Sequence, residues 1–260
     1  MAEVLVFDNP EVAGSFVAGH IVESLGRIHN FTLGVATGST PLPVYQALRA
    51  HVTRGVDFST MFAFALDEYV GLPADYPEGY RAVIEREVTV PLGLNRDRVN
   101  VPDGSLDGIE TAGARYEAAL TANGGVDLQL LGIGTTGHIG FNEPGSSFAS
   151  LTRVKTLTER TRADNARFFA SPDDVPIHCV TQGLGTILRA RHLVLLAFGQ
   201  GKAAAIAAAV EGPLTASMPG SAIQLHPHVT VVLDEAAASE LRFGDYYRWA
   251  QDNKPTWQGI

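Results

Sequence analysis

Cysteine is nearly absent from this chain of 260 residues, which contains a single one, Cys179. One thiol cannot build a disulfide framework, so a disulfide-stabilised secreted fold is excluded and a reducing, cytoplasmic location is expected. The chain also lacks any run of about eighteen apolar residues, which argues against a membrane-spanning helix. The first thirty residues contain no basic segment followed by an apolar one, so no signal peptide is expected.

Positive charge is scarce as well. Lys and Arg number 19 against 28 Asp and Glu, for a net charge of −9, and no basic run occurs. This balance argues against nucleic acid or an anionic membrane as the main partner. An anionic small molecule stays compatible, because a few local donors can outweigh a diffuse opposing charge.

What is present is a hydrophobic fraction of 45% and an alternation of short apolar runs with longer amphipathic ones. The apolar runs predict strands at Val4–Phe7, Phe31–Ala36, Met61–Leu66, Val126–Leu131, His192–Phe198 and Val229–Leu233. The amphipathic stretches predict helices at Glu11–Leu25, Leu42–Ala50, Tyr80–Val88, Leu106–Ala122, Lys202–Val210 and Ala236–Ala250. This order predicts an α/β fold, Rossmann-like, with an open, mainly parallel sheet and helices on both faces. No linker or repeat divides the chain, so residues 1–260 are expected to form a single domain.

The segment 152–180 differs from its surroundings. It carries four arginines in a polar, helix-like run that is followed by a loop rich in Pro and Asp. One interpretation is a solvated helix. The other is a helical lid over the active site, whose cations reach a bound anion.

Polar residues collect after the predicted strands, where open parallel sheets bind their ligands. The turn Thr37–Pro41, TGSTP, leads into a helix for which Thr40 is a good N-cap and Pro41 a good first residue. Gly38 and Ser39 expose backbone N–H groups at that helix start, which suits a phosphate. Lys202 begins another helix after a strand and adds a point charge for the same anion.

Asp67 and Glu68 end the third predicted strand. Only one of them can face the crevice, because neighbouring residues in a strand point to opposite sides. A solvated acidic turn is one interpretation, and a general base for a carbon acid is the other. Asp67, next to the apolar run FAFAL, is the better candidate for the base.

The loop GIGTTGHIGFNEP places His138 and Glu143 among four glycines. His138 can be an ordinary loop histidine or an acid–base catalyst, since imidazole titrates near neutral pH. Glu143 is placed to orient one ring nitrogen if the loop folds back. The other histidines have no convincing metal-ligand spacing, so no metal is expected.

Five motifs, TGSTP, LDEYVGL, GHIGFNEPGSS, NARFF and GQGKA, occur in this order, and together they resemble the glucosamine-6-phosphate deaminase family. The resemblance extends from about Phe31 to Glu235, and GHIGFNEP is its most discriminating part. It implies conversion of D-glucosamine 6-phosphate and water to D-fructose 6-phosphate and ammonia, with no cofactor. A small phosphorylated amino sugar would then be the partner.

The resemblance also implies residue roles. His138, supported by Glu143, assists opening of the sugar ring, and Asp67 moves a proton from C2 to C1. The phosphate is held by Gly38, Ser39, Thr40, Arg167 and Lys202, with Arg167 carried by the lid.

Two departures from the family matter. Thr136 stands where several members have Asp or Asn, so a hydroxyl replaces a negative or amide group beside His138. Members activated by N-acetylglucosamine 6-phosphate are hexamers that bind this effector partly through a pair matched here by Arg153 and Lys155. Leu151, however, replaces a neighbouring arginine of those proteins. A homo-oligomer and an effector site therefore stay open.

Two other functions compete with the deaminase. A 6-phosphogluconolactonase shares the fold and has a related histidine loop, but lacks FNEP. A sugar-phosphate sensor would bind without turnover, although such proteins normally carry a separate basic helix-turn-helix segment.

Overall fold

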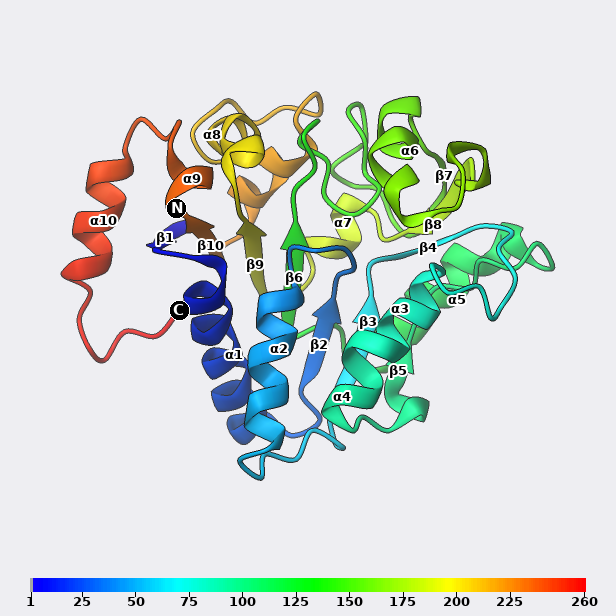
Figure 1. The fold of residues 1–260 in the computed structure, drawn as a ribbon, viewed down its shortest axis with the longest axis horizontal. Coiled ribbons are helices and arrows are strands. Elements are labelled where there is room, and N and C mark those ends of the chain that lie inside the picture. The colour runs from blue at the N-terminus through cyan, green and yellow to red at the C-terminus, as the bar shows by residue number, and fades with distance from the viewer. Residues whose placement is uncertain (1) are drawn as a thin grey trace.

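Parallel strands form the centre of the molecule. The computed structural model describes residues 2–260 and contains a seven-stranded sheet in which every neighbouring pair is parallel (Figure 1). The strands lie in the order β1 (Glu3–Phe7), β10 (Val229–Asp234), β9 (His192–Ala197), β6 (Leu128–Gly132), β2 (Thr32–Val35), β3 (Phe62–Ala65) and β5 (Val99–Asn100). All six predicted strands are therefore present. Every residue of β9 is buried, as expected of an apolar strand covered on both faces.

Helices cover both faces of this sheet, so the predicted α/β architecture is confirmed. One face carries α1 (Pro10–Arg27), α2 (Leu42–Val52) and a helical run of α3 (Tyr80–Ile84), a π-helix (Glu85–Thr89) and α4 (Val90–Leu92). The other carries α5 (Ile109–Ala122), α7 (Leu184–Ile187), α8 (Ala203–Val210) and α9 (Glu235–Ala238). Each face has its own apolar cluster, and the sheet separates the two.

A second, smaller sheet was not predicted. It is antiparallel and consists of β4 (Asp67–Tyr69), β8 (His178–Thr181) and β7 (Arg153–Thr156). The segment 152–180 therefore begins and ends in strands, and the prediction of a helix-like run from Thr152 was wrong there. Between the strands lie the short helix α6 (Glu159–Asn165) and the 3₁₀ turns Ala166–Phe168 and Pro172–Asp174. These turns and α6 stand above the carboxyl ends of the central strands (Figure 1).

Two boundaries also differ from the predictions. The stretch Ala236–Ala250 is not one helix, because α9 ends at Ala238 and α10 (Gly244–Asp252) follows as a separate element. The N-cap of α2 is Pro41 rather than Thr40, and no side chain caps that helix. Further 3₁₀ turns are found at Arg96–Arg98, Gln200–Lys202 and Pro219–Leu225. Within residues 2–260, none of the helices has the length and apolar character that crossing a membrane requires.

Candidate active site

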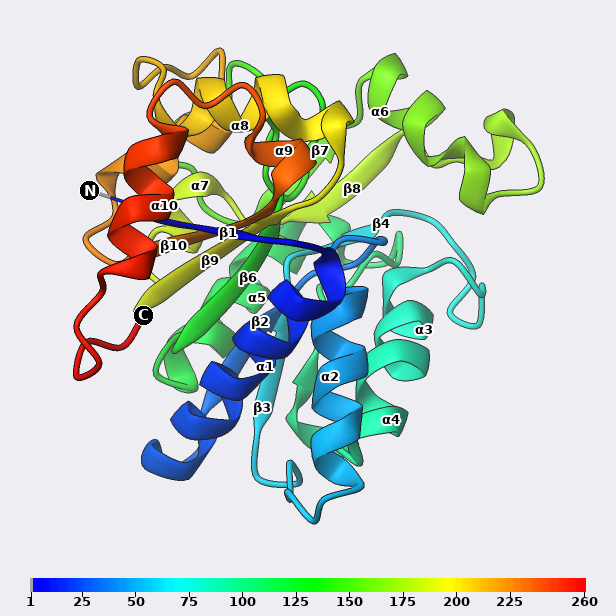
Figure 2. The ribbon, with the colours of Figure 1, turned by 60° about the vertical axis from the view of Figure 1, so that its left-hand side comes forward.

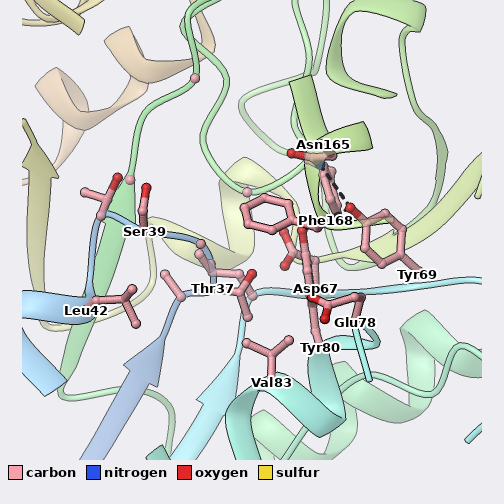
Figure 3. A pocket seen from close by; sticks show the side chains of 18 of the residues that line it. Thr37, Ser39, Leu42, Asp67, Tyr69, Glu78, Tyr80, Val83, Asn165 and Phe168 are labelled. Carbon is pink, nitrogen blue, oxygen red and sulfur yellow. Dashed lines mark hydrogen bonds between the residues drawn. The ribbon is translucent and has the colours of Figure 1, made fainter. Parts of the chain in front are cut away.

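A cavity of about 400 Å³ opens at the carboxyl ends of β2, β3 and β6. The chain leaves β2 toward one edge of the sheet and β6 toward the other, so the cavity lies where the strand order reverses. Its lining includes most of the residues that the sequence singled out: Gly38, Ser39, Thr40, Asp67, His138, Arg167 and Lys202. The loops after the strands and the segment that contains α6 thus converge on one pocket (Figure 3).

Asp67 is the buried acid of this pocket. Only 6% of its surface is exposed, yet it lines the cavity from the start of β4. Burial, reinforced by repulsion from Glu68, raises the pKa of Asp67 to about 8. A carboxyl in this range can exchange a proton with a weak carbon acid near neutral pH.

Glu68 points away from that cavity, as alternation along a strand requires. Its carboxylate accepts hydrogen bonds from the backbone N–H groups of Tyr69, Tyr80 and Arg81, each at 2.8 Å. Tyr80 and Arg81 open α3, so Glu68 satisfies free donors at a helix start. The acidic pair therefore divides into a pocket residue, Asp67, and a structural one.

His138, Thr136 and Glu143 form a hydrogen-bonded relay. Thr136 Oγ1 lies 2.9 Å from Nδ1 of His138 and donates to Oε2 of Glu143 at 3.2 Å. Because the Thr136 hydroxyl has one proton and gives it to the carboxylate, it accepts from the Nδ1–H of His138. In the neutral ring this leaves Nε2 of His138 as the free acceptor. The direct distance from Nδ1 of His138 to Oε2 of Glu143 is 3.5 Å.

Glu143 is held as a carboxylate. Burial alone would favour its protonated form, but the nearby imidazole of His138 and the hydrogen bonds from Thr161 and Thr136 outweigh burial and keep the pKa of Glu143 below its usual value. The loop therefore places a fixed negative charge close to the ring of His138.

The glycines of the loop have specific tasks. A Cβ on Gly134 would lie 2.2 Å from the ring of His138, so only glycine allows the imidazole to pack on the backbone there. Gly137 has φ +79°, and a Cβ on it would meet the sulfur of Met218 at 1.9 Å. The glycines thus allow the close packing that fixes the position of His138.

Cations and free N–H groups gather at another part of the pocket. Gly38 has φ +88°, a conformation that suits glycine and turns the chain from β2 toward α2. Arg167 comes from the 3₁₀ turn after α6, and Lys202 from the turn before α8. Burial lowers the pKa of Lys202, Asp164 opposes this effect, and Arg167 adds to it. Two cations this close to each other suit an anion of more than one negative charge.

Arg153 and Lys155 do not line the pocket. They lie on the same face of β7, two residues apart. The guanidinium of Arg153 donates a hydrogen bond to Oδ1 of Asn142 at 2.7 Å. Asn142 is the residue that precedes Glu143 in the chain. Burial lowers the pKa of Arg153.

Several lining residues had no predicted role. Tyr69, Tyr80 and Asn165 border the cavity, and Asn165 Nδ2 donates to the Tyr69 hydroxyl at 2.9 Å (Figure 3). Tyr69 belongs to the LDEYVGL motif, so the motif was a signal for it. Asn165 is the first residue of the NARFF motif, so that motif was a signal for it. Tyr80 carries no signal of its own, because only the packing of α3 brings it to the cavity. Among residues 2–260, no group of three or more His, Cys, Asp or Glu side chains is arranged to hold a metal ion.

Comparison with known proteins identifies the family. The family model for glucosamine-6-phosphate isomerases and 6-phosphogluconolactonase matches residues 10–232. The glucosamine-6-phosphate deaminase of Streptomyces avermitilis is 58% identical over 260 residues, covering 99% of this chain and all of that protein. That of Rhodococcus jostii is 59% identical over 259 residues, with the same coverage.

Solved structures agree with this assignment. A monomeric glucosamine-6-phosphate deaminase superposes with a TM-score of 0.89 at 39% identity, over 92% of this chain and all of the other. A 6-phosphogluconolactonase from Trypanosoma cruzi reaches 0.75 at 20% identity, over 93% and 97% of the two chains, and shows only that the fold is shared. The resemblance seen in the sequence motifs is confirmed, and the chain belongs to the family of glucosamine-6-phosphate isomerases and 6-phosphogluconolactonases.

Proposed function

We propose that this chain catalyses the isomerisation and deamination of D-glucosamine 6-phosphate, giving D-fructose 6-phosphate and ammonia. The observation that carries the proposal is the pairing, in one pocket, of the buried Asp67 with the His138–Thr136–Glu143 relay. Identity of 58–59% to deaminases along nearly the whole chain supports the same activity.

The substrate phosphate binds where the donors gather. Backbone N–H groups and hydroxyls of Gly38, Ser39 and Thr40 meet it from the start of α2. Lys202 and Arg167 supply positive charge from two other elements. Because Arg167 belongs to the segment 152–180, binding of the phosphate draws this segment over the sugar, as expected of a lid.

Ring opening is the task of His138. Its free Nε2 takes the proton of the anomeric hydroxyl, and the resulting imidazolium returns a proton to the ring oxygen. The C1–O5 bond breaks and C1 becomes an aldehyde. Thr136 and Glu143 orient the ring and stabilise its positive charge during this exchange.

Asp67 then acts on the open chain. As a carboxylate it removes the proton from C2, and the electron pair forms an enolamine between C1 and C2. The protonated Asp67 gives that proton to C1, and a proton of the C2 amino group passes to O1, so C1 becomes an alcohol carbon and C2 an imine. Water adds to the imine, ammonia leaves, and the ketone of fructose 6-phosphate remains.

Ammonia release from glucosamine 6-phosphate by the purified protein is the first test. We expect ammonia and fructose 6-phosphate in equal amounts. Asp67→Asn should lower kcat by about 10²–10⁴-fold, the usual contribution of a general base, while the protein still binds substrate.

The same assay separates the alternatives. A lactonase needs no base for a carbon acid, so hydrolysis of 6-phosphogluconolactone without ammonia would keep the fold and refute the deaminase. Binding of the sugar phosphate with no product of either kind would indicate a sensor.

The effector site stays a prediction. Arg153 and Lys155 share one face of β7, and Arg153 is hydrogen-bonded to the residue next to Glu143. An anion bound at this face would compete with Asn142 for the guanidinium of Arg153 and so affect the loop that carries Glu143. A sigmoidal rate curve that N-acetylglucosamine 6-phosphate makes hyperbolic, with no such response in Lys155→Ala, would support the site and a hexamer. Hyperbolic kinetics without a response would refute it.

A cytoplasmic location likewise stays a prediction from the cysteine content.

A further inference from the structure

The catalytic loop and the segment that contains α6 are joined through one carboxylate oxygen. Oε1 of Glu143 accepts hydrogen bonds from the hydroxyls of Thr161 and Thr158, the latter at 3.3 Å. Thr158 is the N-cap of α6 and Thr161 lies in its first turn. The contact therefore comes from the beginning of the helix that leads to Arg167.

Thr161 is the committed donor of the two. The Thr158 hydroxyl has a single proton, which is shared between Oε1 of Glu143 and Oγ1 of Thr161 at 3.1 Å. Its oxygen also accepts from the backbone N–H of Thr161 at 3.1 Å as the helix cap. Thr161 has only the carboxylate as acceptor for its proton and is just 2% exposed.

The other oxygen of Glu143 faces the catalytic side. Oε2 accepts from Thr136 and lies 3.5 Å from Nδ1 of His138. Apart from His138, no charged or titratable side chain in residues 2–260 is hydrogen-bonded or ion-paired to Glu143. The terminal torsion of a glutamate side chain has no sharp preference of its own, so the donor on Oε1 helps to set where Oε2 points.

We propose that Thr161 is a positioning residue for ring opening, which acts through Glu143 and makes the orientation of His138 depend on the placement of α6. The inference rests on the proposed function. When Arg167 engages the phosphate, α6 is fixed, Thr161 holds Oε1, and the relay from Glu143 through Thr136 to His138 is set. Substrate binding and acid–base catalysis are thereby coupled through one hydroxyl.

The test compares Thr161→Val with Thr161→Ser in the ammonia assay. Valine keeps the shape and removes the donor, and serine keeps the donor. We expect kcat to fall about tenfold in Thr161→Val, the lower end for loss of a hydrogen bond to a charged group, with KM changed less than about twofold. Thr161→Ser should recover kcat to within about twofold of the unmodified protein.

A double-mutant cycle with Glu143→Gln separates positioning from general damage to the fold. Residues that act as one unit are strongly non-additive. If Thr161 acts through Glu143, adding Thr161→Val to Glu143→Gln should cost less than about twofold. An equal loss in both backgrounds, or failure of Thr161→Ser to restore kcat, would overturn the proposal.

Ser171→Ala is the matched control in the same segment. The hydroxyl oxygen of Ser171 accepts a hydrogen bond from the backbone N–H of Asp173 at 3.1 Å, so this variant also removes a local hydrogen bond. It should leave kcat and KM unchanged. If Thr161→Val does not fold, kcat of Thr161→Ala is compared with kcat of Thr161→Ser instead, because these two variants also differ in the hydroxyl donor. Absence of ammonia from the unmodified protein would refute the proposed function, whereas full turnover with no effect in Thr161→Val would refute only this inference.

Discussion

The environment of the Asp67 carboxyl group affects both the stability of the protein and the chemistry proposed for this residue. The residue is buried, and the structure brings Glu68 beside it rather than a cation. Burial and that repulsion raise the pKa of Asp67 to about 8, so the charged form is the costly one. A general base for a carbon acid benefits from the same environment, since a weakly solvated carboxylate holds a proton more strongly.

Removal of the Asp67 charge should therefore stabilise the protein in a pH-dependent way. The folded-state pKa of about 8 lies above the usual aspartate value of 3.8, so the folded protein binds this proton more tightly than the unfolded chain. The contribution of Asp67 to stability accordingly falls as pH rises from about 4 to 8. We expect Asp67→Asn to gain about 1–3 kcal/mol above pH 8, the range for relief of a buried unsatisfied group.

Urea unfolding of both proteins at several pH values from 4 to 9 measures this gain. The difference should be smallest near pH 4, where the folded-state carboxyl is protonated and the unfolded-state carboxyl, whose usual pKa is 3.8, is only partly ionised. Asp75→Asn, at an exposed position, should show no pH-dependent difference. A gain that is constant with pH would mean that charge is not its cause.

At this scale the sequence predicted which polar side chains lie close together but not the hydroxyls that hold them. Alternation along a strand correctly separated Asp67 from Glu68. The predicted pairing of His138 with Glu143 also corresponds to the structure, with Thr136 placed between them. The hydroxyls of Thr158 and Thr161 were not foreseeable, because they reach Glu143 only through the tertiary placement of α6.

Among the elements, the segment 152–180 is notable because it contributes Asn165 and Arg167 to the lining of the cavity. Its helix α6 has seven residues, too few to be stable alone, so its position depends on contacts. Beneath it lies a small apolar cluster that includes Tyr69, Phe141 and Leu157, joined at its border by Phe169. The hydrogen bond from Asn165 to Tyr69 adds a polar tie between α6 and β4 (Figure 3).

Loss of that tie should weaken substrate binding more than turnover. For Asn165→Ala we expect KM to rise about three- to tenfold with kcat within about twofold, since one neutral hydrogen bond contributes about 0.5–1.5 kcal/mol. Tyr69→Phe removes the other partner and should have the same effect. The double variant should be no worse than either single one. Additive losses would instead mean that Asn165 contacts the substrate directly.

Element prediction succeeded where the pattern was local. Six of the seven strands of the large sheet are short apolar runs, which predict buried strands without further information. The seventh, β5, has two half-buried residues and no such run, and it was not predicted. The strands β4, β7 and β8 are three or four residues long and carry charged side chains such as Glu68, Arg153 and Lys155. They exist because they pair with one another, β4 with β8 across more than a hundred residues of sequence and β7 with β8 across more than twenty, and no local pattern reports such pairing.

At the scale of the whole molecule, segments from the two ends of the chain meet at one edge of the large sheet. The strand β1 is at an edge, and α10 from the C-terminal region lies against it (Figures 1 and 2). The side-chain amide of Gln251 in α10 makes the two hydrogen bonds that a neighbouring strand would make to Val6. Its oxygen accepts from the Val6 N–H at 2.8 Å, and its nitrogen donates to the Val6 carbonyl at 3.1 Å. Lys254 pairs with Glu3 beside it. The exposed edge of a parallel sheet is thereby partly satisfied.

Replacement of Gln251 by alanine should open this edge. Two backbone groups of Val6 would lose their partner, so we expect the free energy of unfolding to fall by about 1–2 kcal/mol in urea titrations. An unpaired edge also pairs with other chains, so light scattering should show more self-association at high protein concentration. Gln258→Ala, at an exposed position seven residues further along the chain, is the matched control and should change neither quantity. Equal behaviour of the two variants would mean that apolar packing of α10, rather than the amide of Gln251, protects β1. Ammonia release should stay unchanged in both, because β1 is at the sheet edge and contributes no residue to the pocket that holds Asp67 and His138.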